Sequence, residues 1–283
     1  DMPGDESSER ARGYVAAEAA RLRALGPAAA AGDDEAVHDA RTASRRLRTA
    51  LAVCRPLLAA DGAVPTALRD LGRVLGAVRD PTVQLAWLRA ALDSRPGDET
   101  QARARLEEDR LAARQAGLVA ARRLLGSPEH ARLLVGLDAV VAQPWPPDEG
   151  RIAHRAAREW HRLDRALAAA DEAEADERDA ARHAARRQAR RARYATELVG
   201  GDAAEHSSAL AAKLQDTLGA EHDAVVVRAV VAEVAARARA AGEDTAACAW
   251  LAALADDSAE RAARAARRAA ARANASGHRH WAA

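Results

Sequence analysis

The chain lacks phenylalanine altogether, has a single lysine, and is only 2% aromatic. Ala, Leu and Val supply most of its 49% hydrophobic residues. This composition suits closely packed helices and disfavours sheets, because strands are rich in aromatic and β-branched residues. The two cysteines, Cys54 and Cys248, lie far apart and form no CxxC pair, which excludes a zinc or dithiol motif and predicts buried, reduced thiols. The expected fold is all-α.

Long hydrophobic runs are also missing. The longest uncharged run covers residues 245–255, about half of the roughly 20 residues that a membrane-spanning helix needs. The first ten residues are polar and acidic rather than a basic and apolar leader. We therefore expect neither secretion nor membrane insertion, and a reducing cytoplasmic location fits the cysteine usage.

A strong charge of one sign is absent as well. The chain has 43 basic and 42 acidic residues, a formal net charge of +1. A diffusely basic surface of the kind that coats nucleic acid is therefore excluded. Any anion-binding site must arise from segregation of charge within the fold.

Glycine and proline pairs predict about ten helices. Seven breaks are expected, at Gly26-Pro27, Asp61-Gly62, Asp80-Pro81, Arg95-Pro96-Gly97, Ser127-Pro128, Gly200-Gly201 and Ala241-Gly242. Asp80 and Ser127 are predicted to cap helices that start at Pro81 and Pro128, and Pro56 is predicted to kink a helix. We expect a first helical half (1–142), a proline-rich linker (143–149), a second helical half (150–272) and a disordered tail (273–283).

An internal repeat relates the two halves. Five residues recur as the same type 145 positions later: His38, Arg41, Arg45, Arg46 and Arg48 match His183, Arg186, Arg190, Arg191 and Arg193. Four more recur 143 positions later: Leu71, Leu75, Gly76 and Asp80 match Leu214, Leu218, Gly219 and Asp223, with His222 in the place of Arg79. These identities in one order predict an internal duplication.

The repeated basic residues share one face of each predicted helix. At 100° per residue, His38, Arg41, Arg45 and Arg48 form one stripe, whereas Arg46 lies to the side. No acid occurs between Arg41 and Arg55, nor between residues 182 and 193. Like charges at this spacing repel each other, and guanidinium groups suit phosphate oxygens. The stripes therefore predict a site for an external polyanion, with inorganic polyphosphate the best candidate.

A third basic stripe follows the linker, at Arg151, Arg155, Arg158, Arg162 and Arg165. If its helix packs beside the one that carries Arg186 and Arg190, two cationic faces meet across a groove. A linear polyanion fits such a groove.

Other interpretations stay open at this point. Arginine-rich faces are usually solvated and paired with acids from other helices. A lone histidine is usually a satisfied polar residue. His222-Asp223 is read more readily as a helix start with Asp223 as the cap than as a metal site.

The sequence resembles the CHAD family, the conserved histidine α-helical domain. The likeness runs from about Ser8 to Ala271 and rests on VHDARTASRRLRTALAVCRPLL, LRDLGRVLGAVRDPTVQLAWL, RHAARRQARRARYATEL and LAAKLQDTLGAEHDAVV. The resemblance implies two helical bundles related by a pseudo-twofold axis around a basic central cavity that binds inorganic polyphosphate, often at polyphosphate granules. Arg190 stands where the family usually has lysine, and Ala192 where it has leucine. The Glu-x-Glu-x-Lys mark of a fused triphosphate-tunnel domain is absent.

We therefore predict a non-catalytic polyphosphate-binding module without a cofactor or a metal. The predicted binding residues are His38, Arg41, Arg45, Arg46, Arg48, Arg79, Arg155, Arg158, Arg162, His183, Arg186, Arg190, Arg191, Arg193, Lys213 and His222. One rival is a metal-dependent phosphate-processing enzyme, for which Asp80 and Asp223 are the only repeated acids. The other is a protein that binds nucleic-acid backbones, which the net charge and the few aromatics disfavour.

Overall fold

The computed structural model describes residues 3–58, 62–95, 99–174 and 177–275. Within these ranges the chain forms nine α-helices and one 3₁₀ helix (η1) and has no strand, so the all-α prediction is confirmed. The helices are α1 (Pro3–Ala31), α2 (Asp34–Val53), η1 (Arg55–Leu57), α3 (Ala63–Asp93), α4 (Thr100–Leu125), α5 (Pro128–Ala142), α6 (Arg151–Glu172), α7 (Arg178–Thr196), α8 (Asp202–Ala240) and α9 (Ala246–Ala275).

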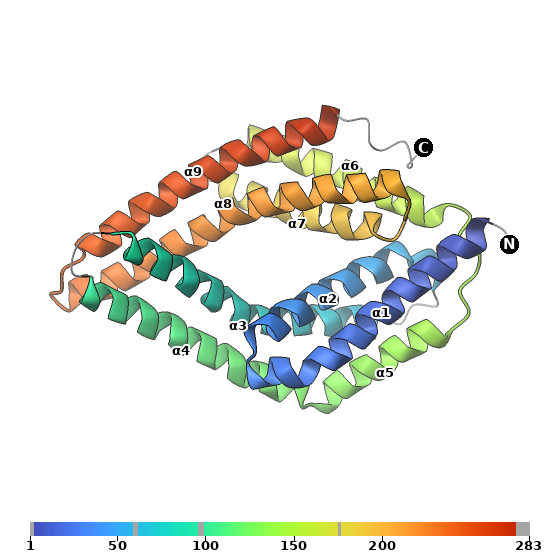
Figure 1. The fold of residues 1–283 in the computed structure, drawn as a ribbon, viewed down its shortest axis with the longest axis horizontal. Coiled ribbons are helices and arrows are strands. Elements are labelled where there is room, and N and C mark those ends of the chain that lie inside the picture. The colour runs from blue at the N-terminus through green and yellow to red at the C-terminus, as the bar shows by residue number, and fades with distance from the viewer. Residues whose placement is uncertain (1–2, 59–61, 96–98, 175–176, 276–283) are drawn as a thin grey trace.

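The helices form two layers of consecutive neighbours. In the first, α1 packs on α2, α2 on α3 and α3 on α4, and α5 lies against α1 and α3. In the second, α6 packs on α7, α7 on α8 and α8 on α9. The two layers lie one above the other in Figure 1, and they contact each other between α2 and α7 and between α3 and α8. The helices that carry the repeated residues are thus among those that join the layers, together with the pairs α4–α8, α2–α6 and α3–α9.

Three groups of buried side chains hold this arrangement. One fills the first layer around Leu47, Leu68 and Leu75. A second surrounds Trp160 in the second layer. A third joins the ends of α3 and α4 to α8 and α9, with Leu106 fully buried. Each fully buried leucine contributes on the order of 1.5–3 kcal/mol, and these contacts fix how α2 and α7 approach each other.

Several predicted helix boundaries are confirmed and others are wrong. Ser127 caps α5 by accepting a hydrogen bond from the backbone N–H of His130, with Pro128 in the first turn. The breaks predicted at Gly26-Pro27 and Asp80-Pro81 are wrong, because both pairs lie inside helices. Pro81 is itself buried in α3, so packing offsets the hydrogen bond that a proline removes.

Two further local predictions need correction. Pro56 does not kink α2, which ends at Val53 and is followed by η1. The pair His222-Asp223 does not start a helix, because it lies in the middle of α8. The end of α2 before Pro56 follows the local preference of proline, which lacks a backbone N–H, whereas Asp223 lies within α8 although aspartate favours helix starts.

Some of the remaining predicted boundaries lie within the described residues and others do not. Residues 273–275 of the predicted tail continue α9, whereas 276–283 and the predicted break at Pro96-Gly97 lie outside the described residues. Cys54 and Cys248 are both buried and unpaired. Among the described helices, none combines the length and apolarity required to cross a bilayer.

Candidate polyanion site between α2 and α7

Four arginines meet where α2 contacts α7. They are Arg41 and Arg45 from α2 and the equivalent Arg186 and Arg190 from α7, and we call them the central arginine cluster. Burial, and then the charge of Arg190, lower the pKa of Arg45 to about 9. Burial, and then the charge of Arg186, lower the pKa of Arg190 to about 10. The folded protein therefore holds like charges close together in a partly desolvated place.

Carboxylates meet only half of this cluster. Nη1 of Arg41 lies 3.0 Å from Oδ1 of Asp80 on α3, and Nη2 of Arg186 lies 3.4 Å from Oδ1 of Asp223 on α8. These two contacts join equivalent residues of the predicted repeat. By contrast, no carboxylate of a described residue lies within 4.0 Å of the guanidinium of Arg45 or Arg190. An excess of two positive charges is left at the centre of the site.

The two repeated glycines lie beside the paired arginines, and the approach is tight at Gly76 but ordinary at Gly219. A Cβ atom at Gly76 would lie 3.1 Å from Nη2 of Arg41, and one at Gly219 would lie 3.6 Å from Nη2 of Arg186. Each guanidinium therefore lies flat against the neighbouring helix. Nε of Arg41 and Nε of Arg186 are both buried and donate no hydrogen bond to a described residue. Burying such a donor costs on the order of 1–3 kcal/mol, so the cluster is held at the expense of stability.

The repeated histidines flank the cluster. Nδ1 of His183 lies 3.3 Å from Nδ1 of His222, and the two ring centroids are 4.3 Å apart. Burial, and then the charge of His222, lower the pKa of His183 to about 4. His38 is exposed, and burial, followed by the charge of Arg79, lowers its pKa. Both repeated histidines are therefore neutral near pH 7. His38 has Arg79 as a neighbour, and His183 has His222, the residue that the predicted repeat matches to Arg79.

Three other predicted binding residues are neutralised by acids from elsewhere in the fold. Nη1 of Arg46 lies 3.1 Å from Glu18, and its Nε lies 3.1 Å from Glu197. Nε of Arg191 lies 3.1 Å from Glu159. Nε of Arg193 lies 3.2 Å from Glu197, one turn further along.

The two stripes contain no acids of their own, but acids from other helices pair with some of their arginines. The lack of acids in the stripe sequences therefore did not show which arginines are unpaired. Glu18 and Glu159 lie on α1 and α6, and their side chains are 11% and 7% exposed. Arg46 and Arg191 therefore join neighbouring helices and stand outside the central arginine cluster. Their position to the side of the stripe was the only sequence signal of this role.

Of the remaining predicted cations on α2, α3 and α8, Arg79 is half-buried, whereas Arg48 and Lys213 are exposed. Arg48 lies on the same face of α2 as Arg45, and burial, followed by the charges of Arg69 and Arg191, lowers its pKa. Lys213 is exposed on α8.

The stripe of α6 faces a neighbour that was not predicted. Arg155, Arg158 and Arg162 line a cavity of about 250 Å³ together with Arg55 and the end of α2. This cavity contains no residue of α7, although α6 does pack on α7, so the predicted groove between this stripe and Arg186 and Arg190 stays a prediction. Nη1 of Arg155 donates a hydrogen bond to the carbonyl of Ala52 at 3.0 Å, which fixes it toward α2.

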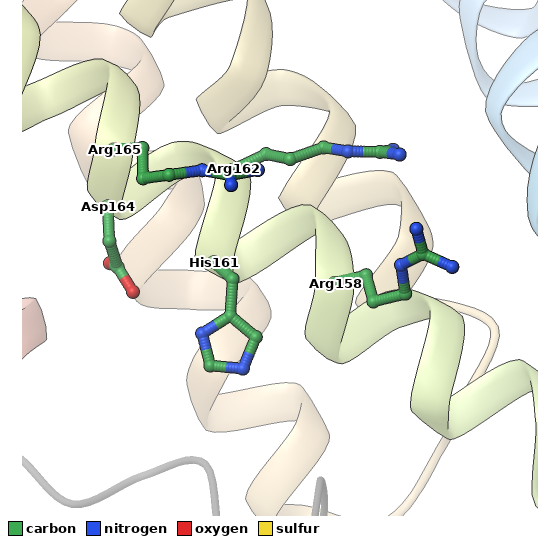
Figure 2. Close-up of a pocket in the computed structure, with 5 residues that line it drawn as sticks. All are labelled: Arg158, His161, Arg162, Asp164 and Arg165. Atoms are coloured by element: carbon green, nitrogen blue, oxygen red, sulfur yellow. The ribbon is translucent and has the colours of Figure 1, made fainter.

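A second, shallower cavity of about 480 Å³ continues along α6. It is lined by Arg158, His161, Arg162, Asp164 and Arg165, and in Figure 2 the side chains of Arg158 and Arg162 extend toward one side of the view, whereas those of His161 and Asp164 point downward. A third cavity of about 370 Å³ lies at the turn between α7 and α8, beside Arg193 and Glu197. The central arginine cluster lines none of these three cavities, so the central cavity stays a prediction.

The described residues contain no group of three or more His, Cys, Asp or Glu side chains placed to hold a metal ion. Asp80 and Asp223, the repeated acids, each form an ion pair with an arginine. Burial raises the pKa of Asp223. The groups that the site offers to a ligand are guanidinium and imidazole side chains.

The chain is similar to a known protein family and to two curated proteins. A family model described as the CHAD domain matches residues 13–232. An uncharacterized protein from each of two strains of Mycobacterium tuberculosis is 31% identical over 223 residues, which cover 75% of this chain and 42% of the relative. The chain therefore spans less than half the length of these curated relatives.

Two solved structures share the fold. PptA from Streptomyces chartreusis superposes with a TM-score of 0.78 at 22% identity, covering 93% of this chain and 99% of that one. The CHAD domain from the plant Ricinus communis superposes with a TM-score of 0.64 at 23% identity, covering 96% and 88%. At these identities the likeness establishes the fold alone.

Proposed function

The chain belongs to the CHAD domain family, and from that premise we propose that it binds inorganic polyphosphate at the central arginine cluster. Association with polyphosphate is the role known for this family. The observation that carries the proposal is the pair Arg45 and Arg190, which approach each other from α2 and α7 without a carboxylate partner among the described residues. A polyanion would supply the negative charge that these two arginines lack among the described residues.

Phosphate oxygens suit this arrangement. The guanidinium fork binds them through paired, charge-assisted hydrogen bonds, each of which contributes roughly 1.5–3 kcal/mol. Ligand binding would also relieve the repulsion among the four arginines. A polyphosphate chain carries its negative charges in a row, so it can satisfy arginines from both helices at once.

We propose binding rather than catalysis. An enzyme that cleaves polyphosphate would need carboxylates free to hold a metal ion, and Asp80 and Asp223 are each engaged by an arginine. The rival predicts release of phosphate from long-chain polyphosphate in the presence of Mg²⁺ or Mn²⁺. Our proposal predicts no release above a protein-free control, and sustained turnover would contradict it.

The direct test is a binding titration with labelled long-chain polyphosphate at several salt concentrations. For each phosphate contact the logarithm of the association constant should fall by about 0.7 per tenfold rise in salt, because bound counterions are released. The double variant Arg45→Glu/Arg190→Glu should abolish binding. The matched control Arg132→Glu/Arg264→Glu reverses two exposed arginines on α5 and α9 and should bind normally.

Competition separates polyphosphate from nucleic acid as the ligand. Unlabelled polyphosphate should displace a single-stranded oligonucleotide far more readily than the oligonucleotide displaces polyphosphate. The reverse order would favour a nucleic-acid-backbone binder. In cells, we propose that the protein associates with polyphosphate granules through the same site, so the Arg45→Glu/Arg190→Glu variant should lose that association.

A further inference from the structure

The cavity of about 250 Å³ between α2 and α6 is a second basic site, which we call the α2–α6 groove. Its lining consists of Ala52, Val53, Arg55, Arg155, Arg158, Glu159 and Arg162. Four of these seven residues are arginines and one is an acid. The groove therefore concentrates positive charge in a chain whose net charge is only +1.

The single acid of the groove is already shared. Glu159 accepts hydrogen bonds from Arg162 and from Gln188, and forms an ion pair with Arg191. Its side chain is 7% exposed, so it lies beneath the arginines rather than among them. Arg55 and Arg158 are exposed, and neither guanidinium makes a hydrogen bond or an ion pair with a described residue. Positive charge in the groove remains available to a ligand.

The basic face of α2 connects this groove to the central arginine cluster. At 100° per residue, Ala52 lies about 20° from Arg45 and about 40° from Arg48 around the helix axis. The distance along the axis from Arg45 to Ala52 is roughly 10 Å at 1.5 Å per residue. Arg48 lies between them and its side chain is exposed. Its partial burial, followed by the charges of Arg69 and Arg191, lowers its pKa. The sequence has no acid between Arg41 and Arg55.

We infer that a polyphosphate chain bound at the central arginine cluster continues past Arg48 into the α2–α6 groove, so that the protein selects long chains over short ones. This inference rests on the proposed function. A chain of three phosphates would bind at the central arginine cluster alone, whereas a long chain would occupy both sites. The second contact is then intramolecular, and its high effective concentration raises the overall affinity.

The experiment compares tripolyphosphate with long-chain polyphosphate as two probes of the same protein. The variant Arg55→Gln/Arg158→Gln removes two charges from the groove without breaking a contact with a described residue. Its melting temperature should match that of the unmodified protein. Its affinity for long chains should fall by about tenfold per arginine, and the salt dependence should weaken by about 1.4 in logarithmic slope. Its affinity for tripolyphosphate should be unchanged.

The matched control is Arg132→Gln/Arg264→Gln, which removes two exposed arginines elsewhere and should change neither affinity. The central variant Arg45→Gln/Arg190→Gln should weaken binding of both probes. An equal loss for both probes in the groove variant, or no loss for either, would overturn the inference while leaving the proposed function in place. Failure of the unmodified protein to bind long chains would instead overturn the proposed function, and this inference with it.

Discussion

Replacing Arg45 and Arg190 together by glutamine should stabilise the unliganded protein and at the same time weaken its binding of polyphosphate. Most substitutions of half-buried residues destabilise a fold. A gain is expected here because both guanidiniums are held near other arginines, and neither has a carboxylate partner among the described residues. Glutamine retains hydrogen-bonding capacity and removes the charge.

The magnitude follows from the pKa of Arg45. Burial, and then the charge of Arg190, lower it from the ordinary value of an arginine to about 9. One pKa unit corresponds to about 1.4 kcal/mol, which sets an upper limit on the order of 5 kcal/mol for this residue. Solvent screening at the partly exposed site reduces this to on the order of 1–2 kcal/mol. Because the folded pKa is the lower one, the cost is fully present at pH 7 and fades only above about pH 9.

Replacement of Arg46 should have the opposite effect on the free energy of unfolding. Arg46 lies one position further along α2, and its guanidinium pairs with Glu18 and Glu197, whose side chains are 11% and 17% exposed. Arg46→Gln leaves the largely buried Glu18 without its paired arginine and leaves Glu197 paired, among the described residues, with Arg193 alone. This change should lower the free energy of unfolding by about 2–3 kcal/mol.

Urea unfolding followed by far-UV circular dichroism measures both effects at pH 7 and low salt. Our reasoning requires opposite signs, a gain for Arg45→Gln/Arg190→Gln and a loss for Arg46→Gln. In the presence of polyphosphate the order should reverse, because only a protein that binds the ligand is stabilised by it. If the double variant loses as much stability as Arg46→Gln, the central arginines are structural and the assignment of the site is refuted.

Two further predictions concern groups around the cluster. Because the folded pKa of His183 is lowered to about 4, the stability that its neutral form provides should be lost as pH falls from about 6.5 to about 4, and less so in His183→Asn. Bound polyphosphate favours the protonated ring, so affinity should increase over the same range; an affinity that is independent of pH there would argue against contact between His183 or His222 and the ligand. Gly219→Ala should stabilise α8 by up to about 1 kcal/mol, whereas Gly76→Ala should gain less because its Cβ would lie 3.1 Å from Arg41. Equal gains in thermal unfolding would show that the close approach at Gly76 has no energetic weight.

Composition and periodicity were sufficient to predict the fold class, because a chain rich in alanine and leucine with few aromatics has few alternatives to packed helices. The helix cap at Ser127 could also be predicted, because Ser127 and His130, whose backbone N–H donates a hydrogen bond to the serine, lie only three residues apart. Pro81 was misread because its position in α3 depends on burial against other helices. Boundaries followed the sequence where local contacts dominate and departed from it where tertiary packing dominates.

The site divides in the same way. The repeat identified Arg41, Arg45, Arg186 and Arg190 without any structural knowledge. It could not show that Asp80 pairs with Arg41, since the two residues are 39 positions apart and their contact depends on how α2 packs on α3. Adjacent arginines 45 and 46 look alike in the sequence and differ in the fold, because the partners of Arg46 come from α1 and from the end of α7.

A crystal structure of the protein grown with polyphosphate would test the central claim most directly. We predict phosphate oxygens about 2.7–2.9 Å from guanidinium nitrogens of both Arg45 and Arg190, the usual separation in charge-assisted hydrogen bonds. A polyphosphate chain bound only to the outer surface, with these two arginines touching no phosphate, would contradict the account.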